Sequence, residues 1–306
     1  SSGTATCTDT CTITGGTSSS TNFNVFHSFS EFNVNSGHTV TFDNPGVENI
    51  FSRVTGSTLS NIDGTLKVNG SADLFLLNSN GILFGDESSL DIKGSFFATT
   101  AESFLFENNQ SFDNTDSSVT SLLTVSAPIG LQLGASSGAI SLSGTGHRMR
   151  YSSRGITRNF LGAPNSGLSV AAGKNIALIG ADISLQSANL LAEGGHVEVG
   201  AIGGGTVDFN LRNDRWQFDY GQSTDFGNIS LAQNSVQQAS AIDVSGPNAG
   251  SIHLQGSRIH LQDGSTLLAQ ITGSGSGEIV IDASESLTLA GTNLSGGGSF
   301  MQTSVY

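Results

Sequence analysis

The sequence of 306 residues has no long apolar run, few charged residues and only two cysteines. A helix that crosses a membrane needs about 18 or more consecutive apolar residues, and no such run occurs, so no helical membrane span is expected. The opening residues, SSGTATCTDTCTITGG, have neither a charged n-region nor an apolar h-region. We therefore expect any signal peptide to have been removed.

Basic residues are scarce. Lysine and arginine total 11, against 25 aspartates and glutamates, and the formal net charge is −14. A nucleic-acid backbone would be repelled by this charge, so no nucleic-acid partner is expected. Adhesion to anionic lipid through a basic patch is not expected either. An acidic balance suits solubility outside a cell.

Both the charged fraction, 12%, and the hydrophobic fraction, 36%, are low. Intrinsic disorder usually combines low hydrophobicity with high charge, and this chain lacks the charge. The remaining composition is rich in glycine, with 40 residues, and in serine, threonine and asparagine. Such a composition is typical of many short strands joined by many turns.

The two cysteines, Cys7 and Cys11, lie in the segment CTDTC. One interpretation is a local disulfide formed in an oxidising compartment, and the other is half of a metal site. No third or fourth thiol and no nearby His-x-His supports the metal, so we predict the disulfide and no metal or other cofactor. So small a ring removes little chain entropy, and its main effect would be to hold the N-terminus in place.

Apolar residues alternate with polar ones, and amphipathic helix patterns are scarce. Pairs that follow this period of two are Val40 and Phe42, Leu66 and Val68, and Leu90 and Ile92. This period is the signature of strands with one buried face, and glycine, asparagine, aspartate and serine interrupt it every few residues.

The second half of the sequence repeats itself. GNISL begins at Gly227, GSIHL at Gly250 and GEIVI at Gly277, and a longer pattern beginning at Gly180 returns at Gly256. Imperfect repeats of strands and glycine-rich turns indicate stacked coils, each about 4.8 Å from the next. A parallel β-helix is therefore the expected fold, and a β-sandwich is the alternative.

An open end of a β-helix is an exposed sheet edge that must be covered. Phe23, Phe26, Phe29 and Phe32 are candidates for an N-terminal cap, with ordinary core packing as the alternative. Two segments, 146–160 and 206–226, break the alternation and are expected to leave the coils as loops or hairpins.

Several segments together carry a family resemblance: HSFSEFNV (27–34), IFSRVTG (50–56), SNIDGTLKVNGSADLFLLNSNGILFG (60–85), SLDIKGSFFATTA (89–101), LLTVSAPIGLQLG (122–134), GLSVAAGKNIALIGADISL (167–185) and NLLAEGGHVEVGAIGGG (189–205). The sequence resembles the N-terminal secretion domain of two-partner secretion (TPS) exoproteins, the family of filamentous haemagglutinin. The amino-acid sequences of the strands resemble those of cyanobacterial members most.

The family's signature turn reads Asn-Pro-Asn-Gly-Ile, and here it is Asn78, Ser79, Asn80, Gly81 and Ile82. Serine replaces the proline, so a fixed φ is lost while both asparagines and the glycine remain. The turn is either a necessary corner between two buried strands or a contact read by the transporter, and both interpretations stay open.

A second family motif, Asn-Pro-Asn-Leu, has its nearest match at Asn44 and Pro45, where Gly46 and Val47 replace the last two residues. Arg148 and Arg150 belong to an arginine-rich segment that either contacts acidic surfaces of the transporter or is a solvated loop.

The resemblance implies a right-handed parallel β-helix with an N-terminal cap and extra-helical hairpins, at the start of a longer, monomeric exoprotein. We expect residues 1–21 to form an N-terminal segment, 22–205 the secretion domain, and 206–306 further coils of the same domain after a loop insertion.

The family route begins at the general secretory translocase and crosses the periplasm. The exoprotein then passes through an outer-membrane transporter of the Omp85 superfamily, whose polypeptide-transport-associated (POTRA) domains bind this domain. The product is secreted or displayed at the cell surface, and folding begins here and continues coil by coil.

An enzyme on a β-helix would need clustered carboxylates or a basic residue on one exposed face. Asp182, Asp208 and Asp243 lie in different local patterns with no recurring paired spacing, and His196 and His260 look like single histidines on strands. We therefore predict that the chain is not an enzyme.

A surface adhesin or glycan-binding domain is the alternative function. Trp216 and Tyr220, with acidic residues beside them, are the candidate glycan patch, provided that their rings are exposed. The alternative for these two residues is a hairpin whose aromatic rings pack on the wall of the β-helix.

Overall fold

The structure is a computed structural model that describes residues 2–7, 10–115, 127–147, 150–152, 155–157, 167–212, 215–234, 238–248, 250–273, 275–293 and 296–305. Within these ranges every regular element is a β-strand except one short 3-10 turn, η1 (Glu107–Asn109), and turns and loops join the strands. No helix in the described ranges is long and apolar enough to cross a membrane.

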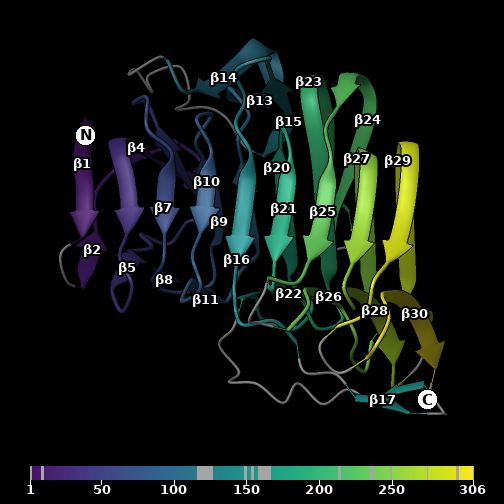
Figure 1. The fold of residues 1–306 in the computed structure, drawn as a ribbon. Coiled ribbons are helices and arrows are strands. Elements are labelled where there is room, and N and C mark those ends of the chain that lie inside the picture. The colour runs from purple at the N-terminus through teal and green to yellow at the C-terminus, as the bar shows by residue number, and fades with distance from the viewer. Residues whose placement is uncertain are drawn as a thin grey trace.

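Three parallel ladders of strands wind into a β-helix, and the coils follow chain order from the purple N-terminal strands to the yellow C-terminal strands (Figure 1). The first ladder contains β1 (Ser2–Cys7), β4 (Asn24–Val34), β6 (Asn49–Val54), β9 (Asp73–Leu77), β12 (Phe96–Thr99), β20 (Asn175–Gly180), β23 (His196–Arg212), β27 (Ser251–Gln262) and β29 (Glu278–Ala290).

The second ladder begins with the later parts of β1 and β4 and contains β7 (Ser60–Ile62), β10 (Ile82–Phe84), β16 (Ile140–Ser143), β21 (Ile183–Gln186) and β25 (Ile229–Ala232). It continues into the later halves of β27 and β29. The third contains β2 (Cys11–Ile13), β5 (Thr39–Phe42), β8 (Thr65–Val68) and β11 (Ser89–Asp91), followed by β19 (Leu168–Ser169), β22 (Asn189–Leu191), β26 (Ala241–Asp243), β28 (Thr266–Ile271) and β30 (Phe300–Val305).

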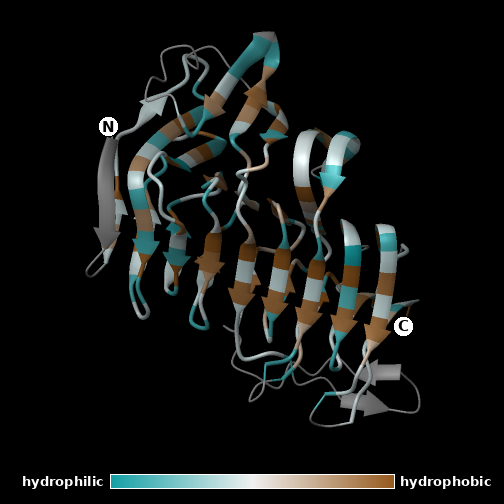
Figure 2. Ribbon diagram, turned by 45° about the horizontal axis from the view of Figure 1, so that its top comes forward, coloured by the Kyte–Doolittle hydropathy of each residue, from teal (hydrophilic) through white to brown (hydrophobic). Residues whose placement is uncertain are grey.

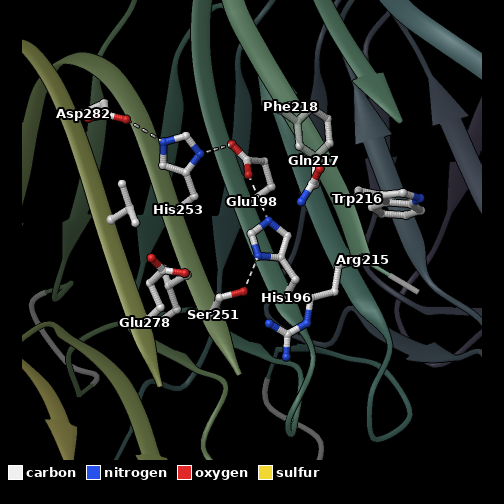
Figure 3. A pocket seen from close by; sticks show the side chains of 12 residues that line it. His196, Glu198, Arg215, Trp216, Gln217, Phe218, Ser251, His253, Glu278 and Asp282 are labelled. Atoms are coloured by element: carbon white, nitrogen blue, oxygen red, sulfur yellow. Dashed lines mark hydrogen bonds and ion pairs between the residues drawn. The ribbon is translucent and has the colours of Figure 1, made fainter. Parts of the chain in front are cut away.

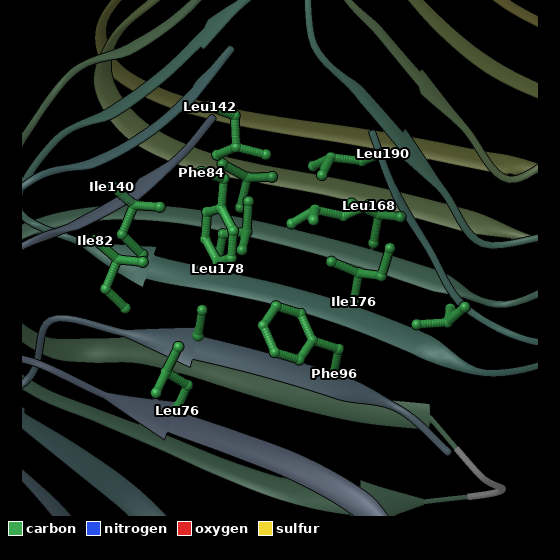
Figure 4. Close-up of a cluster of buried hydrophobic side chains, with 14 of the residues drawn as sticks. Leu76, Ile82, Phe84, Phe96, Ile140, Leu142, Leu168, Ile176, Leu178 and Leu190 are labelled. Carbon is green, nitrogen blue, oxygen red and sulfur yellow. The ribbon is translucent and has the colours of Figure 1, made fainter. Parts of the chain in front are cut away.

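The inner core consists of side chains stacked in register. Ile183, Ile229 and Ile259 stack on three successive strands of the second ladder, and the longer repeat correctly matches Ile183 with Ile259. The short repeat is only partly right, because GSIHL and GEIVI pair with each other in the first ladder, whereas GNISL lies in the second. Figure 4 shows how inward leucine, isoleucine and phenylalanine side chains from successive coils fill the interior. Apolar and polar residues alternate along each strand, because successive side chains point to opposite faces. Neighbouring strands pair in register, so the brown apolar bands in Figure 2 recur from one coil to the next. The predicted all-β parallel β-helix is confirmed.

A second core lies outside the coils. Phe26, Phe51, Phe75 and Phe97 stack outward on four successive strands of the first ladder, with centroid separations of 5.2, 4.5 and 5.7 Å. We call this row the aromatic ladder. An exposed apolar row of this size is unfavourable in water, so it requires a cover.

An antiparallel sheet supplies that cover. It contains β13 (Ser103–Phe106), β14 (Gln110–Asp113), β15 (Pro128–Leu133), the later part of β23 and β24 (Arg215–Phe226), which group together in Figure 1. Its rings pack on the aromatic ladder, as in the contacts of Phe104 with Phe51 and Phe75. A further antiparallel hairpin joins β17 (Arg150–Ser152) and β18 (Gly155–Thr157).

The four phenylalanines expected to form an N-terminal cap are instead divided among different environments. Phe26 belongs to the aromatic ladder, Phe29 and Phe32 are buried in the inner core, and Phe23 is largely exposed. The strands that precede them, β1 and β2, pair with β4 and β5, and the short β3 (Thr17–Ser18) runs antiparallel to β4. These strands, rather than the rings, form the N-terminal end of the described β-helix.

Candidate functional sites

The turn from Asn78 to Ile82 joins β9 to β10 at a corner of the β-helix. Asn78 is fully buried, and its Nδ2 donates to the carbonyl of Thr58 and to Oγ of Ser60, both at 3.0 Å. Its Oδ1 accepts the backbone N–H of Asn80 at 3.0 Å, which closes the turn. The Asn78 amide thus links this corner to the preceding coil.

The rest of the turn divides between buried and exposed residues. Ser79 is buried, and its Oγ accepts from Nδ2 of Asn114 at 2.5 Å. Gly81 has a φ of 123°, where a side chain would be strained, and Ile82 points into the core. Asn80 is exposed, and its Nδ2 donates to the carbonyl of Gly56 at 2.8 Å. Asn80 is therefore the side chain of this turn that a partner can reach.

Asn44 and Pro45 form a separate turn that leads towards β6. Oδ1 of Asn44 accepts the backbone N–H groups of Gly46 and Val47, both at 2.8 Å. Pro45 is exposed. The asparagine therefore has a local structural role, as is common for this residue in turns.

Three of the predicted residues lie partly or wholly outside the described part of the structure. Arg148 is not described, and the side chains of Arg150 and Cys7 are not described either. Cys11 takes part in a disulfide bond. Its pairing with Cys7 stays a prediction.

The proposed glycan patch needs a correction. Trp216 and Tyr220 are only 4% and 8% exposed, because their rings face the wall of the β-helix from β24. Trp216 packs against Phe75 and Phe97. Rings buried in this way do not offer open faces to a sugar. The alternative prediction, a hairpin whose aromatic rings pack on the wall of the β-helix, is the one that fits these two residues.

Glu198 is the centre of a polar cluster on the outer face of the first ladder. Its Oε2 accepts from Nε2 of His196 at 2.9 Å, and its Oε1 contacts Nδ1 of His253 at 2.9 Å and the hydroxyl of Tyr220 at 2.5 Å. Nε2 of His253 also lies 3.0 Å from Oδ2 of Asp282. Three donors thus surround one buried carboxylate and tie β24 to β23 and β27.

These contacts shift the pKa values of the cluster. Burial alone would raise the pKa of Glu198, but the hydrogen bonds and charges of His196 and His253 outweigh it and lower the pKa. Burial alone would lower the pKa of His253, and the bonds to Glu198 and Asp282 instead raise it to about 9. Burial and the nearby Glu198 charge raise the pKa of Tyr220 well above its usual 10. The cluster is a carboxylate beside a protonated histidine at neutral pH.

A pocket of about 440 Å³ opens above this cluster (Figure 3). Residues from β23, β27 and β29 form its floor, and Arg215, Trp216, Gln217 and Phe218 of β24 form its side. Groups of histidine, cysteine and acidic residues suited to a metal ion are absent from the part of the chain that the structure describes.

Comparison with known proteins identifies the family. A family model described as the TPS secretion domain matches residues 2–254. The chain belongs to the TPS secretion domain family. It is a TPS domain of a two-partner secretion exoprotein, and TPS domains work with a TpsB transporter partner.

Two solved structures are similar to this TPS domain. The secretion domain of filamentous hemagglutinin has 17% identity and a TM-score of 0.48, with 95% of this chain and 96% of that chain covered. The HMW1 secretion domain from Haemophilus influenzae has 17% identity and a TM-score of 0.28, with 91% and 88% covered. A search of curated proteins returned no match.

The family match is wider than the expected range 22–205, since it includes β1 and β2 before it and the β23–β24 hairpin and the start of β27 after it. The family consists of secretion domains and is not an enzyme family. Asp182 lies in the bend between β20 and β21, Asp208 lies on β23, and Asp243 lies on β26. Asp182 and Asp208 are exposed, and Asp243 is buried.

The cluster around Glu198 escaped prediction in this TPS domain. The sequence pattern predicts single histidines at His196 and His260, but His196 is buried and hydrogen-bonded to Glu198, and His260 lies elsewhere on β27. The signal was present in the repeats GHVEVG and GSIHLQ, because aligning them places His196 beside Ser251 and Glu198 beside His253.

Proposed function

We propose that this TPS domain is the secretion signal and folding nucleus of its exoprotein, recognised by the POTRA domains of an Omp85-superfamily barrel. The family match over residues 2–254 is the observation that supports this function. The route begins at the general secretory translocase, continues through the periplasm and the barrel, and ends at the cell surface or in the medium.

Recognition through the 78–82 turn is assigned to Asn80. Asn78, Ser79 and Ile82 are buried in the folded domain, whereas Asn80 is exposed and bonded only to its own turn and to Gly56 among the described residues. A partner that reads the folded turn therefore meets the Asn80 amide. The Arg148–Arg150 segment and the Asn44–Pro45 turn are secondary contact candidates.

Folding would begin with the coils that leave the barrel first. Neighbouring coils contact each other through segments close in sequence, so stacking can propagate from one end. The aromatic ladder gives this process two stages. Phe26, Phe51, Phe75 and Phe97 stack among themselves at once, but their cover comes from residues 103–226. Folding of the early coils is thus completed only after β24 has emerged.

The test is export of residues 1–306 from a Gram-negative host with and without the cognate barrel. Asn80→Ala is compared with Asn61→Ala, which changes an exposed asparagine on β7 outside the turn. We expect export to require the barrel. We also expect Asn80→Ala to reduce it about tenfold, the effect of about 1.4 kcal/mol of lost binding free energy, while Asn61→Ala exports as wild type.

Melting of each purified variant separates folding from recognition. Reduced export of an Asn80→Ala protein that melts like wild type supports recognition of the turn. Wild-type export in that variant makes the turn a structural corner only. Retention of the wild-type chain in the periplasm when the barrel is present contradicts the secretion function itself.

A further inference from the structure

The pocket above Glu198 lies just beyond the last ring of the aromatic ladder, beneath the β24 strand of the antiparallel cover. Along the aromatic ladder, Phe97 is followed in register by Ala177, Glu198, His253 and Val280. The wall therefore changes from rings to polar groups, while β24 continues over it. The space between them is the 440 Å³ pocket, within the ~300–1,000 Å³ typical of small-molecule sites.

The floor of this pocket is fixed before any ligand arrives. Glu198 is 1% exposed and held by His196, His253 and Tyr220. Nδ1 of His196 lies 2.8 Å from Oγ of Ser251, and both residues line the pocket. Whichever of these two atoms donates, the serine oxygen keeps at least one lone pair for another donor. Groups held in this way lose little entropy on binding.

Other lining groups still have hydrogen-bonding capacity. Within the described residues, the Gln217 amide and the Glu278 carboxylate have no side-chain partner, and both are exposed. Asp282 uses Oδ2 for His253, which leaves its other oxygen as an acceptor. The pocket thus offers an amide that both donates and accepts, a serine oxygen and carboxylate oxygens within one space.

Charge and shape restrict the class of ligand. Two positive groups, Arg215 and protonated His253, lie among three carboxylates, those of Glu198, Glu278 and Asp282. A strong anion and a strong cation would therefore each meet groups of their own sign. One side of the pocket is formed in part by the ring of Phe218, which is only partly buried. A ligand with many hydroxyl groups and apolar C–H faces matches both properties.

We propose that this pocket binds a neutral saccharide of the size of a mono- or disaccharide. Gln217, Glu278, Asp282 and Ser251 hydrogen-bond its hydroxyls, and Phe218 packs on its ring. The site differs from the patch expected from the sequence, since Tyr220 is buried beneath it as a donor to Glu198. The proposal does not depend on the secretion function, because it concerns the folded domain alone.

The experiment uses the purified chain on an array of neutral glycans that includes lactose, maltose, cellobiose and mannobiose, with hits measured by calorimetry on the free sugar. Gln217→Ala and Glu278→Gln are the pocket variants. Glu285→Gln is the matched control, on the same strand as Glu278 but outside the pocket lining. All changed residues are exposed, and circular dichroism checks that each variant folds.

We expect at least one neutral glycan to bind, each pocket variant to weaken that binding about tenfold, and the control to leave it unchanged. The proposal is overturned if no neutral glycan binds the wild-type domain. It is also overturned if the pocket variants bind as wild type, or if spermidine or sulfate binds the pocket more tightly than any neutral sugar.

Discussion

The indole ring of Trp216 packs against the ring of Phe75, with 5.7 Å between the two centroids. Phe75 belongs to the aromatic ladder of an early coil, and Trp216 lies on β24, much later in the chain. Trp216 also packs on Phe97, with 5.2 Å between centroids. The second core is therefore closed by a segment that follows most of the coils it covers.

Replacing Trp216 with alanine should lower the free energy of unfolding by about 3–5 kcal/mol, because a large buried ring is lost and a cavity remains. Urea denaturation followed by far-UV circular dichroism measures the change. Leu211→Ala is the control, since Leu211 faces Trp216 across the hairpin but is 55% exposed. It should change stability by less than about 1 kcal/mol. Equal losses in the two variants would contradict this account.

The fluorescence of Trp216 should report closure of the cover. Trp216 is the one tryptophan of the chain, and its ring is buried against the aromatic ladder. During refolding, we expect the far-UV signal of strand formation to develop before the tryptophan signal. Superimposed traces would show that the coils and the cover fold in one step.

Asn78 and Asn80 should differ sharply in their effect on stability. Asn78→Ala leaves the buried Ser60 hydroxyl and Thr58 carbonyl without this donor, and should cost about 1–3 kcal/mol. Asn80→Ala affects an exposed side chain and should cost less than about 1 kcal/mol. Thermal melts of the two variants test this difference. A larger loss in Asn80→Ala would make its export phenotype a folding effect.

The domain should lose stability at alkaline pH through His253. Its pKa is raised from 6.5 to about 9 in the folded state, so the native chain holds this proton more tightly than the unfolded chain. The stabilisation is complete below pH 6.5 and is lost as the pH rises through 9, by at most about 3 kcal/mol. Denaturation of wild type and His253→Gln at pH 6 to 10 measures the difference. Parallel pH profiles would argue against a charged His253.

The opposite dependence is expected at acidic pH through His27. It is buried beside Phe29 and Phe42, and burial lowers its pKa to about 4. The unfolded chain therefore takes up this proton first, and stability falls as the pH drops from 6.5 to about 4, by at most about 3 kcal/mol. His27→Leu should show a smaller fall over this interval than wild type. An equal fall would assign acid sensitivity to the carboxylates instead.

Local sequence was enough to predict the β-helix. The recurring Ile-x-Leu pattern places Ile183, Ile229 and Ile259 on one face of successive strands, and stacking is the arrangement that buries them. The corner at Asn78 was also predictable, because asparagine and glycine favour such turns. The burial of Asn78 was not, since it depends on Thr58 and Ser60 of the preceding coil.

The polar cluster shows why the candidate site was harder to predict. His196 and His253 lie in separate repeats, and each has an ordinary strand pattern around it. Only the register between β23 and β27, together with the approach of Tyr220 from β24, places them around one carboxylate. The pattern within one segment does not show that residues of different segments contact the same carboxylate.

The sequence by itself determined the alternation of apolar and polar residues, the repeat and the corner turns, and hence the stacked coils, because these depend on neighbours within one coil or between successive repeats. Tertiary structure alone decided how the antiparallel cover docks, which buries Trp216 on Phe75 and brings the Tyr220 hydroxyl to Glu198. These contacts join segments far apart in the chain, and their free energy exists only once both surfaces have formed.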